Sequence, residues 1–326
     1  MSVEITRDPC FDQKVVVVDG LPHAGKTLIL PILKGFESIE LPLMNPVYDT
    51  TCQLVSIGKL PSDAAVALLR MTADMDLYSS RLSRNSNFRL FDVPGVITSG
   101  FIWRHLKRLG IRESPNFPMQ IQAEGRILHV LTHGVFRFSS ILSDAFKERL
   151  RFIEILRHPA YIMRVSLMVS NGDASGRPNA PLLVRTDAGC VPWYATDWAE
   201  EYGALSLAER IVRATLGFID SGNKFESQLS TEQRCRYLRL PVEAIMKSPP
   251  SVFCQIQAFL NHIPHRGIER YLRAYQLPRR VSKAYIEQEK SEVVNMFRER
   301  SVSDAFLRLF LQQCSEYESA YHVISD

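Results

Sequence analysis

The sequence predicts an α/β fold with a mostly parallel central sheet. Four consecutive valines at 15–18 form a β-branched run that is typical of a buried strand. Further apolar runs at 126–134 and 152–156 are each followed by a segment with helical periodicity. Strands that alternate with helices of this size imply right-handed βαβ units, whose strands lie parallel in one sheet.

The loop after the valine run fits a phosphate-binding pattern. Residues 20–27 read GLPHAGKT and match G-x-x-x-x-G-K-[ST] at every fixed position. In this pattern backbone N–H groups surround phosphate oxygens, a helix directs its positive end at them, and the lysine adds a charge. We therefore predict a P-loop fold of three layers, with a helix that begins near Thr27. The expected phosphate-binding residues are Gly20, Leu21, Pro22, His23, Ala24, Gly25, Lys26 and Thr27.

In the next part of the chain, the pattern of apolar residues predicts a short strand or loop at 36–46 and a helix at 62–83. The stretch NFRLFDVPGVI at 87–97 predicts a strand that leads to Asp92. An aspartate at a strand end that faces a phosphate loop is able to hold magnesium, and D-x-P-G resembles the switch segment of GTPases. A strand that simply stops in a Pro-Gly turn fits the same letters, and no N-K-x-D motif follows a later strand.

Two later strand ends carry candidate site residues. His133 follows the apolar run of RILHVLTHG, and Arg157 follows the run at 152–156, before a His-Pro break and another helix. Ligands of open parallel sheets bind at the carboxyl ends of the strands. We therefore expect Gly20, His133 and Arg157 to lie at the same edge of the sheet.

The remainder of the chain predicts elaborations of one domain that spans 1–326. Residues 171–202 are rich in turn formers and read as an excursion, a hairpin and loop on the acceptor side of the site. Its aromatic residues Trp193, Tyr194 and Trp198 suit either stacking on sugar rings or core packing. A strand-like stretch follows at 236–245, and 262–326 reads as largely helical.

Composition limits the class of protein. The chain has 326 residues, 46% of them hydrophobic, and a net charge of +4 without a clustered basic face, so we expect no nucleic-acid partner. The six cysteines form no C-x-x-C pair, which favours reduced thiols. No apolar run of 18 residues occurs, so we expect no integral membrane segment and a cytoplasmic protein. The sequence does not indicate an oligomeric state.

Four segments, in order from Lys14 to about Asn261, together resemble the sulfotransferases that use 3′-phosphoadenosine 5′-phosphosulfate (PAPS), especially bacterial members thought to act on surface saccharides. GLPHAGKT looks like the phosphosulfate loop of that family, and LTHG like the strand end that bears its catalytic histidine. EILRHPAYIMRVSL resembles the segment that grips the 3′-phosphate, and LRLPVEAIMKSPPSVFCQIQAFLN resembles the late strand and helix of the family.

The resemblance implies a role for each candidate residue. His133 would take the proton of the acceptor hydroxyl, and Lys26 with the loop N–H groups would hold the 5′-phosphosulfate. Arg157 and Ser166 would hold the 3′-phosphate, where a planar guanidinium binds two oxygens at once. PAPS would be the co-substrate, a saccharide or other small molecule the acceptor, and no metal would be required.

The sequence departs from the family pattern at several positions. His23 stands where many sulfotransferases have the loop lysine, and Lys26 stands where threonine is usual. Ser166 lies nine residues after Arg157 rather than the more common eight, so that Ser170 or Arg164 is an alternative. The C-terminal R-K-G-x-x-G loop of the family is missing as written, and a basic stretch at 277–283 is a loose substitute that contains Arg279, Arg280 and Lys283.

Two other functions are consistent with the same sequence motifs. One is an ATP-dependent small-molecule kinase, in which Lys26 would contact the β- and γ-phosphates while Thr27 and Asp92 hold magnesium. The other is a nucleotide-binding protein without transfer activity. If His133 is not the base of a transferase, the carboxylates near the aromatic excursion, Asp197, Glu200 and Glu201, are the remaining candidates.

Overall fold

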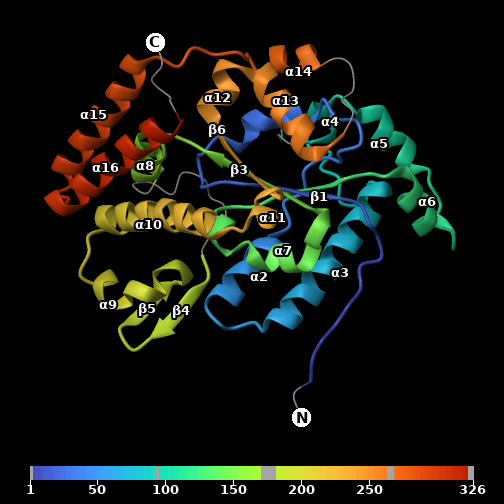
Figure 1. The fold of residues 1–326 in the computed structure, drawn as a ribbon, viewed down its shortest axis with the longest axis horizontal. Coiled ribbons are helices and arrows are strands. Elements are labelled where there is room, and N and C mark those ends of the chain that lie inside the picture. The colour runs from blue at the N-terminus through green and yellow to red at the C-terminus, as the bar shows by residue number, and fades with distance from the viewer. Residues whose placement is uncertain (1–2, 91, 93–94, 170–180, 263–267, 322–326) are drawn as a thin grey trace.

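The centre of the molecule is a sheet of four parallel strands in the order β2-β1-β3-β6 (Figure 1). The computed structural model describes residues 3–90, 92, 95–169, 181–262 and 268–321. The strands predicted at 15–18, 126–134, 152–156 and 236–245 are confirmed, and the valine run forms β1, one of the two inner strands. The strand bounds are Val15–Asp19 for β1, Leu128–Leu131 for β2, Leu150–Leu156 for β3 and Tyr237–Pro241 for β6.

Helices cover both faces of the sheet, as the predicted three layers require. Val15 and Val17 face a core shared with α2 (Pro46–Ser56), α3 (Ser62–Arg81) and α7 (Ser140–Phe146). Val16 and Val18 face the opposite core, shared with α1 (Leu30–Leu33), α12 (Val242–Lys247), α13 (Pro249–Leu260) and α14 (Ile268–Ala274). Because successive side chains of a strand point to opposite faces, one run of valines supplies both cores.

A third core lies beyond the carboxyl end of β3. It joins α8 (Pro159–Val169) and α10 (Leu207–Gln228) to the C-terminal helices α15 (Lys283–Glu299) and α16 (Asp304–Tyr321), which stand side by side in Figure 1. The other elements are the hairpin β4 (Leu183–Thr186) and β5 (Gly189–Pro192), and the short helices α4 (Val96–Ser99), α5 (Ile102–Leu109), α6 (Phe117–Glu124), α9 (Ala199–Tyr202) and α11 (Thr231–Arg234).

The helix expected after the loop at 20–27 is shorter than its sequence pattern suggested. A 3₁₀ turn, Lys26–Ile29, is followed by the single α-helical turn of α1. Pro31 explains the break, because a proline has no N–H to donate to the carbonyl of Thr27 four residues earlier. Leu30 N donates to that carbonyl instead, in the i to i−3 pattern of a 3₁₀ helix.

The strand predicted at 87–97 is wrong for the part of it that the structure describes. Residues 87–90 and 92 are irregular, while 91, 93 and 94 lie outside the described residues. Asn87 closes a local turn, since its side chain accepts a hydrogen bond from Arg89 N at 3.0 Å and its carbonyl accepts one from Val96 N at 2.7 Å. Such local bonds compete with pairing in a sheet, and Leu90 is left 63% exposed.

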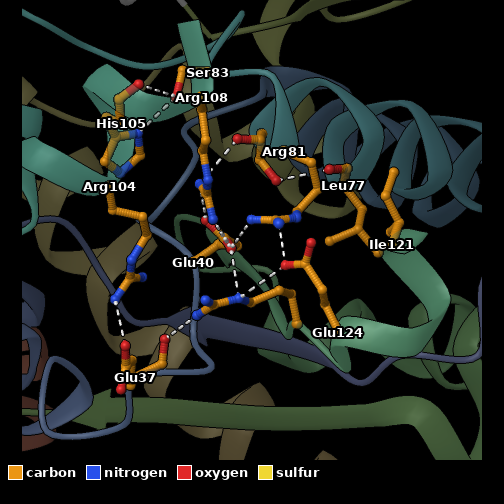
Figure 2. A network of polar contacts seen from close by, with 12 residues as sticks. Glu37, Glu40, Leu77, Arg81, Ser83, Arg104, His105, Arg108, Ile121 and Glu124 are labelled. Carbon is orange, nitrogen blue, oxygen red and sulfur yellow. Dashed lines mark hydrogen bonds and ion pairs between the residues drawn. The ribbon is translucent and has the colours of Figure 1, made fainter. Parts of the chain in front are cut away.

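A buried cluster of charged side chains ties the segment beside β2 to α3 and α5 (Figure 2). Parallel bridges from Ile39 and Leu43 place that segment at the sheet edge, where the sequence predicted a short strand or loop. Between the two bridges Glu40, 3% exposed, accepts two hydrogen bonds of 2.7 Å from Arg108. Further ion pairs join Arg81, Arg126 and Glu124 to the same cluster.

Candidate functional site

The loop at 20–27 adopts a backbone path that requires glycine at two positions. Gly20 has φ +151°, and a Cβ there would lie 2.5 Å from the carbonyl oxygen of Ile155. Gly25 has φ +87°, and a Cβ there would lie 3.0 Å from Val242 Cγ2 and 3.4 Å from Arg157 Nη1. The glycines therefore let the loop pack directly against the carboxyl end of β3 and the residue that follows it.

The loop presents unpaired N–H groups, the feature that a bound phosphate needs. The backbone N–H groups of His23, Gly25, Lys26 and Thr27 donate no hydrogen bond to any residue that the structure describes. Only the turn itself is closed internally, by a bond from Ala24 N to Leu21 O at 3.1 Å. Consecutive unpaired N–H groups make a concave site for an anion.

Lys26 lies inside the loop. Its Nζ donates a hydrogen bond of 2.6 Å to the carbonyl of Gly20 and a longer one of 3.5 Å to that of Leu21. Burial lowers the pKa of this ammonium group, and the nearby carboxylates of Asp19 and Asp49 act in the opposite direction. The lysine charge is therefore held at the base of the loop, close to the unpaired N–H groups.

Arg157 adds a second cation beside the loop. Its guanidinium stacks on the ring of Tyr161, with Cζ 3.1 Å from the ring centroid. It makes no ion pair or hydrogen bond with any residue in the described part of the chain. Burial and the charges of Lys26 and Arg157 together lower the pKa of His23. The three side chains therefore share one electropositive region at the carboxyl ends of β1 and β3.

His133 is held at the carboxyl end of β2 by two aspartates. Asp49, in the first turn of α2, accepts a hydrogen bond from His133 N at 2.7 Å, and its other oxygen lies 3.9 Å from His133 Nδ1. Asp19 is fully buried and accepts bonds of 2.9 Å from Thr132 Oγ1 and from Phe136 N. These bonds fix the turn on both sides of His133, whose side chain is 42% exposed.

An open cleft of about 690 Å³ lies over this histidine. Leu21, Pro22, Asp49 and His133 line it on the sheet side, and the aromatic excursion closes the opposite side through Trp193 and Tyr194. Trp193 is also a core residue, 5% exposed and packed edge-on against Phe138 and Phe218. Trp198 does not line the cleft and packs on Tyr202.

The structure separates Ser166 from Arg157. Ser166 lines the cleft over His133, whereas Arg157 lines neighbouring cavities and not that cleft. The alternative Arg164 is paired with Glu289 at 2.5 Å, and Ser170 lies outside the described residues. The expectation that Ser166 and Arg157 bind one phosphate together therefore stays a prediction, since the two residues line adjoining but different cavities.

The basic stretch at 277–283 does lie near Arg157. Arg279 N donates a hydrogen bond of 2.8 Å to Met246 O at the end of α12. Val281 and Tyr285 line a small cavity together with Arg157, Tyr161 and Glu243. Arg280 lies in the connection before α15 and Lys283 is the first residue of that helix, and both are exposed. The segment therefore lies close to Arg157, and contact of its basic residues with a nucleotide stays a prediction.

The other acidic candidates do not reach the cleft over His133. Asp197, Glu200 and Glu201 are exposed on the excursion, and Glu201 pairs with Arg213. Asp92 accepts a hydrogen bond of 3.0 Å from Asn87 and lines a different cleft that none of the loop residues 20–27 touches. Sequence reasoning missed Asp19 and Asp49, because only tertiary contacts bring them to the turn around His133. It also missed Tyr161, although this residue lies only four positions after Arg157.

Comparison with solved structures finds similar chains among sulfotransferases. The sulfotransferase domain of the Synechococcus PCC 7002 olefin synthase is 16% identical, with 98% of this chain and 99% of that chain covered and a TM-score of 0.45. The sulfotransferase domain from the curacin biosynthetic pathway is 15% identical, with 78% and 76% covered and a TM-score of 0.40. Sulfotransferase STF9 from Mycobacterium avium is 13% identical, with 98% and 78% covered and a TM-score of 0.43.

All three are named sulfotransferases, the family that the four sequence segments resemble. No family model and no curated protein sequence matches the chain. At these identities and scores the similarity describes the path of the chain and assigns no activity, acceptor or site residue. Separately, none of the helices in the described ranges has the length and apolar character needed to cross a membrane.

Proposed function

We propose that this protein is a sulfotransferase that uses PAPS and transfers its sulfuryl group to a hydroxyl of a saccharide or other small acceptor. The observation that carries the proposal is the guanidinium of Arg157, unpaired among the described residues, beside the four unpaired N–H groups of the loop. PAPS has two separate anionic groups, a 5′-phosphosulfate and a 3′-phosphate. The loop suits the first group and Arg157 the second.

The residues around the loop suit the reaction as well as the binding. Bound PAPS would supply an activated sulfuryl group, and the chain would have to position it and stabilise the charge on the leaving phosphate. Lys26 and the loop N–H groups are preorganised donors of the kind that stabilise such charge. These donors act on the phosphate oxygens directly and do not require a metal ion to do so.

His133 is the proposed general base, and Asp49 its positioning partner. His133 is exposed at the wall of the cleft, so its imidazole is accessible to an acceptor hydroxyl. The Asp49 carboxylate lies 3.9 Å from Nδ1, near enough to orient the ring and to stabilise its protonated form. Tyr194, half-buried at the same cleft, offers ring surface to the acceptor, whereas Trp193 is buried in the core behind it.

The kinase alternative has less support in the geometry. Its second metal ligand, Asp92, lines a cleft apart from Lys26 and Thr27. A triphosphate would use the loop but would leave Arg157 without an equivalent role. The three functions nevertheless differ in what they predict. A sulfotransferase, a kinase and a nucleotide-binding protein without activity differ in the nucleotide that they bind or in whether they transfer a group.

Ligand-induced stabilisation separates the three functions. The melting temperature would be measured with 3′,5′-adenosine bisphosphate, with ATP and magnesium, and without nucleotide, because a ligand that binds only the folded state raises it. We expect stabilisation by the bisphosphate without metal. Stabilisation by ATP and magnesium alone would overturn the proposal in favour of a kinase. Transfer of labelled sulfate from PAPS to acceptor would then distinguish an enzyme from a binding protein.

The role of His133 is tested by substitution. His133→Ala should cut the transfer rate roughly 10²–10⁴-fold, the usual contribution of positioned acid–base catalysis, without changing affinity for the bisphosphate. Asp49→Asn should cause a smaller loss of rate, because it leaves the base in place and weakens only its orientation. A wild-type rate in purified, folded His133→Ala protein would remove this residue from the mechanism.

A further inference from the structure

A second cleft of about 540 Å³ lies beside the one over His133. Its walls are the connection before α2, the face of α3 that carries Asp76, and the turn after α3 at 85–87. Met44 and Pro46 line both clefts, so the two are neighbours on the surface. A ligand long enough to pass Met44 would therefore occupy both.

The polar lining of this second cleft includes unused hydrogen-bonding groups. Asp76 is 5% exposed, and its Oδ2 accepts bonds of 3.0 Å from Asn45 Nδ2 and from Tyr48 OH. Its Oδ1 accepts none from the residues that the structure describes. The side chain of Asn85 is exposed and likewise bonds to no described residue. The Oδ1 atom is accessible at the cleft wall, where a ligand or water completes its bonds.

The charge of the lining is negative. Among the residues that the structure describes, its charged side chains are Glu40, Asp76 and Asp92, and none is a lysine or an arginine. Glu40 is paired with Arg108, and Figure 2 shows this pair. Asp92 is partly offset by Arg89, whose Nε lies 3.3 Å from its carboxylate. Asp76 has no ion pair among the described residues, so an anionic ligand would meet a repulsive surface.

Amide, hydroxyl and carboxylate groups from Asn85, Ser86, Asn87 and Asp76 present donors and acceptors next to one another. Sugar hydroxyls, which both donate and accept, suit such a mixture. Among the described residues this lining has no tryptophan, tyrosine or phenylalanine for a sugar ring to stack on, whereas Tyr194 lines the first cleft. The two clefts thus offer complementary contacts to successive units of one chain.

We propose that the second cleft binds the sugar units next to the one that is modified, and that these units carry hydroxyl or amino groups but no carboxylate or sulfate. This inference rests on the proposed function for the identity of the first cleft and adds the class of acceptor. The acceptor is an oligosaccharide chain that spans both clefts over Met44, and uronic acid chains are excluded by the charge of Asp76 and Asp92.

A printed array of defined oligosaccharides tests the inference without any nucleotide. It would hold mono- to hexasaccharides of three classes, namely neutral sugars, amino sugars and uronic acids. We expect binding that grows with length up to about a tetrasaccharide, with uronic acid chains bound at least 10-fold more weakly. Absence of binding to every chain, or equal binding of uronic acid chains, would overturn the inference.

Matched variants locate the binding. Asn85→Ala should weaken tetrasaccharide binding about 3- to 10-fold, the equivalent of one net hydrogen bond, and leave monosaccharide binding unchanged. Asn116→Ala, an exposed asparagine that makes no side-chain bond to its own helix, is the control and should change neither. Equal effects of the two variants would place the binding elsewhere.

The two proposals fail in different ways. Failure of the proposed function would leave the wild-type protein without stabilisation by 3′,5′-adenosine bisphosphate. Failure of this inference would leave that stabilisation intact while the array stays blank or favours uronic acids. Asn85→Ala should not alter stabilisation by the bisphosphate in either case, since Asn85 does not line the cavities around Arg157.

Discussion

Two regions of this protein hold several arginine or lysine side chains, and they treat those charges in opposite ways. In the cluster around Glu40, each of Arg81, Arg104, Arg108 and Arg126 has a carboxylate within 4.0 Å. At the loop, Arg157 has no such partner among the described residues. Its neighbours Lys26 and His23 bring no negative charge to it. Paired charges hold elements together, whereas unpaired charges that are kept close together are available to a ligand.

The arginines of the Glu40 cluster and the cations at the loop also have different surroundings. Figure 2 shows the carboxylates of Glu37, Glu40 and Glu124 between the arginines of the cluster, so each arginine has a negative partner inside the protein. At the loop, the acidic groups Asp19 and Asp49 lie on the side of Lys26 and His133, and Arg157 instead stacks on Tyr161. A bound anion would supply the missing negative charge at Arg157.

The largest effect is expected from removing the charge at the centre of the paired cluster. Glu40→Gln should lower the free energy of unfolding by about 3–5 kcal/mol, because it leaves a buried arginine without its partner. Urea unfolding monitored by circular dichroism measures this. The control is Glu113→Gln, which breaks an exposed pair with Arg84 and should cost far less. Similar losses in the two variants would contradict a structural role for the Glu40 cluster.

Removal of the unpaired arginine should weaken ligand binding and leave the stability of the protein almost unchanged. Arg157→Ala should weaken binding of 3′,5′-adenosine bisphosphate by about 1.5–3 kcal/mol, the range for a hydrogen bond to a charged group. Its free energy of unfolding without nucleotide should stay within about 0.5 kcal/mol of wild type. Calorimetric titration and urea unfolding give the two numbers. A variant that binds the nucleotide normally but unfolds easily would make Arg157 a structural residue.

Acid should destabilise the paired region through His105. Burial first, and then the charge of Arg108, lower the pKa of this histidine from 6.5 to about 4. The folded protein therefore keeps His105 neutral where the unfolded chain binds a proton. The stabilisation is complete above pH 6.5 and is lost as the pH falls toward 4, by about 2 kcal/mol at pH 5.

Unfolding measured between pH 7 and pH 5 tests this prediction when wild type is compared with His105→Asn. The variant should lose less stability across that range, because one of the protons taken up on unfolding is gone. The buried His129, whose pKa burial also lowers to about 4, contributes equally to both proteins. Identical slopes in the two proteins would show that His105 titrates normally in the folded state.

Much of the sheet was predictable from the sequence. The valine run at 15–18 and the apolar runs before His133 and Arg157 became strands, because buried parallel strands need continuous apolar residues. The errors lay where local bonds override that pattern. Asn87 closes a turn in place of the predicted strand, and Pro31 shortens the helix that a glycine-rich loop usually starts.

The candidate site was only partly predictable. Gly20, His133 and Arg157 follow three strands that the structure shows to be neighbours in the sheet, so their common edge follows from the order of strands and loops. The partners of these residues did not follow, since Asp49 comes from a helix 84 residues away from His133 in the chain. Ser166 also could not be placed, because the face of α8 that it occupies depends on how that helix packs.

The sequence by itself determined the alternation of strands and helices, the phosphate-type loop and the residues at the strand ends, because these depend on local composition and spacing. Tertiary structure alone decided which charges are paired. Arg108 becomes structural because folding brings Glu40 to it from 68 residues away in the chain. Arg157 stacks on Tyr161, four residues further along, and meets no carboxylate among the described residues. Long-range contacts such as that of Glu40 with Arg108 have no signature in a single sequence.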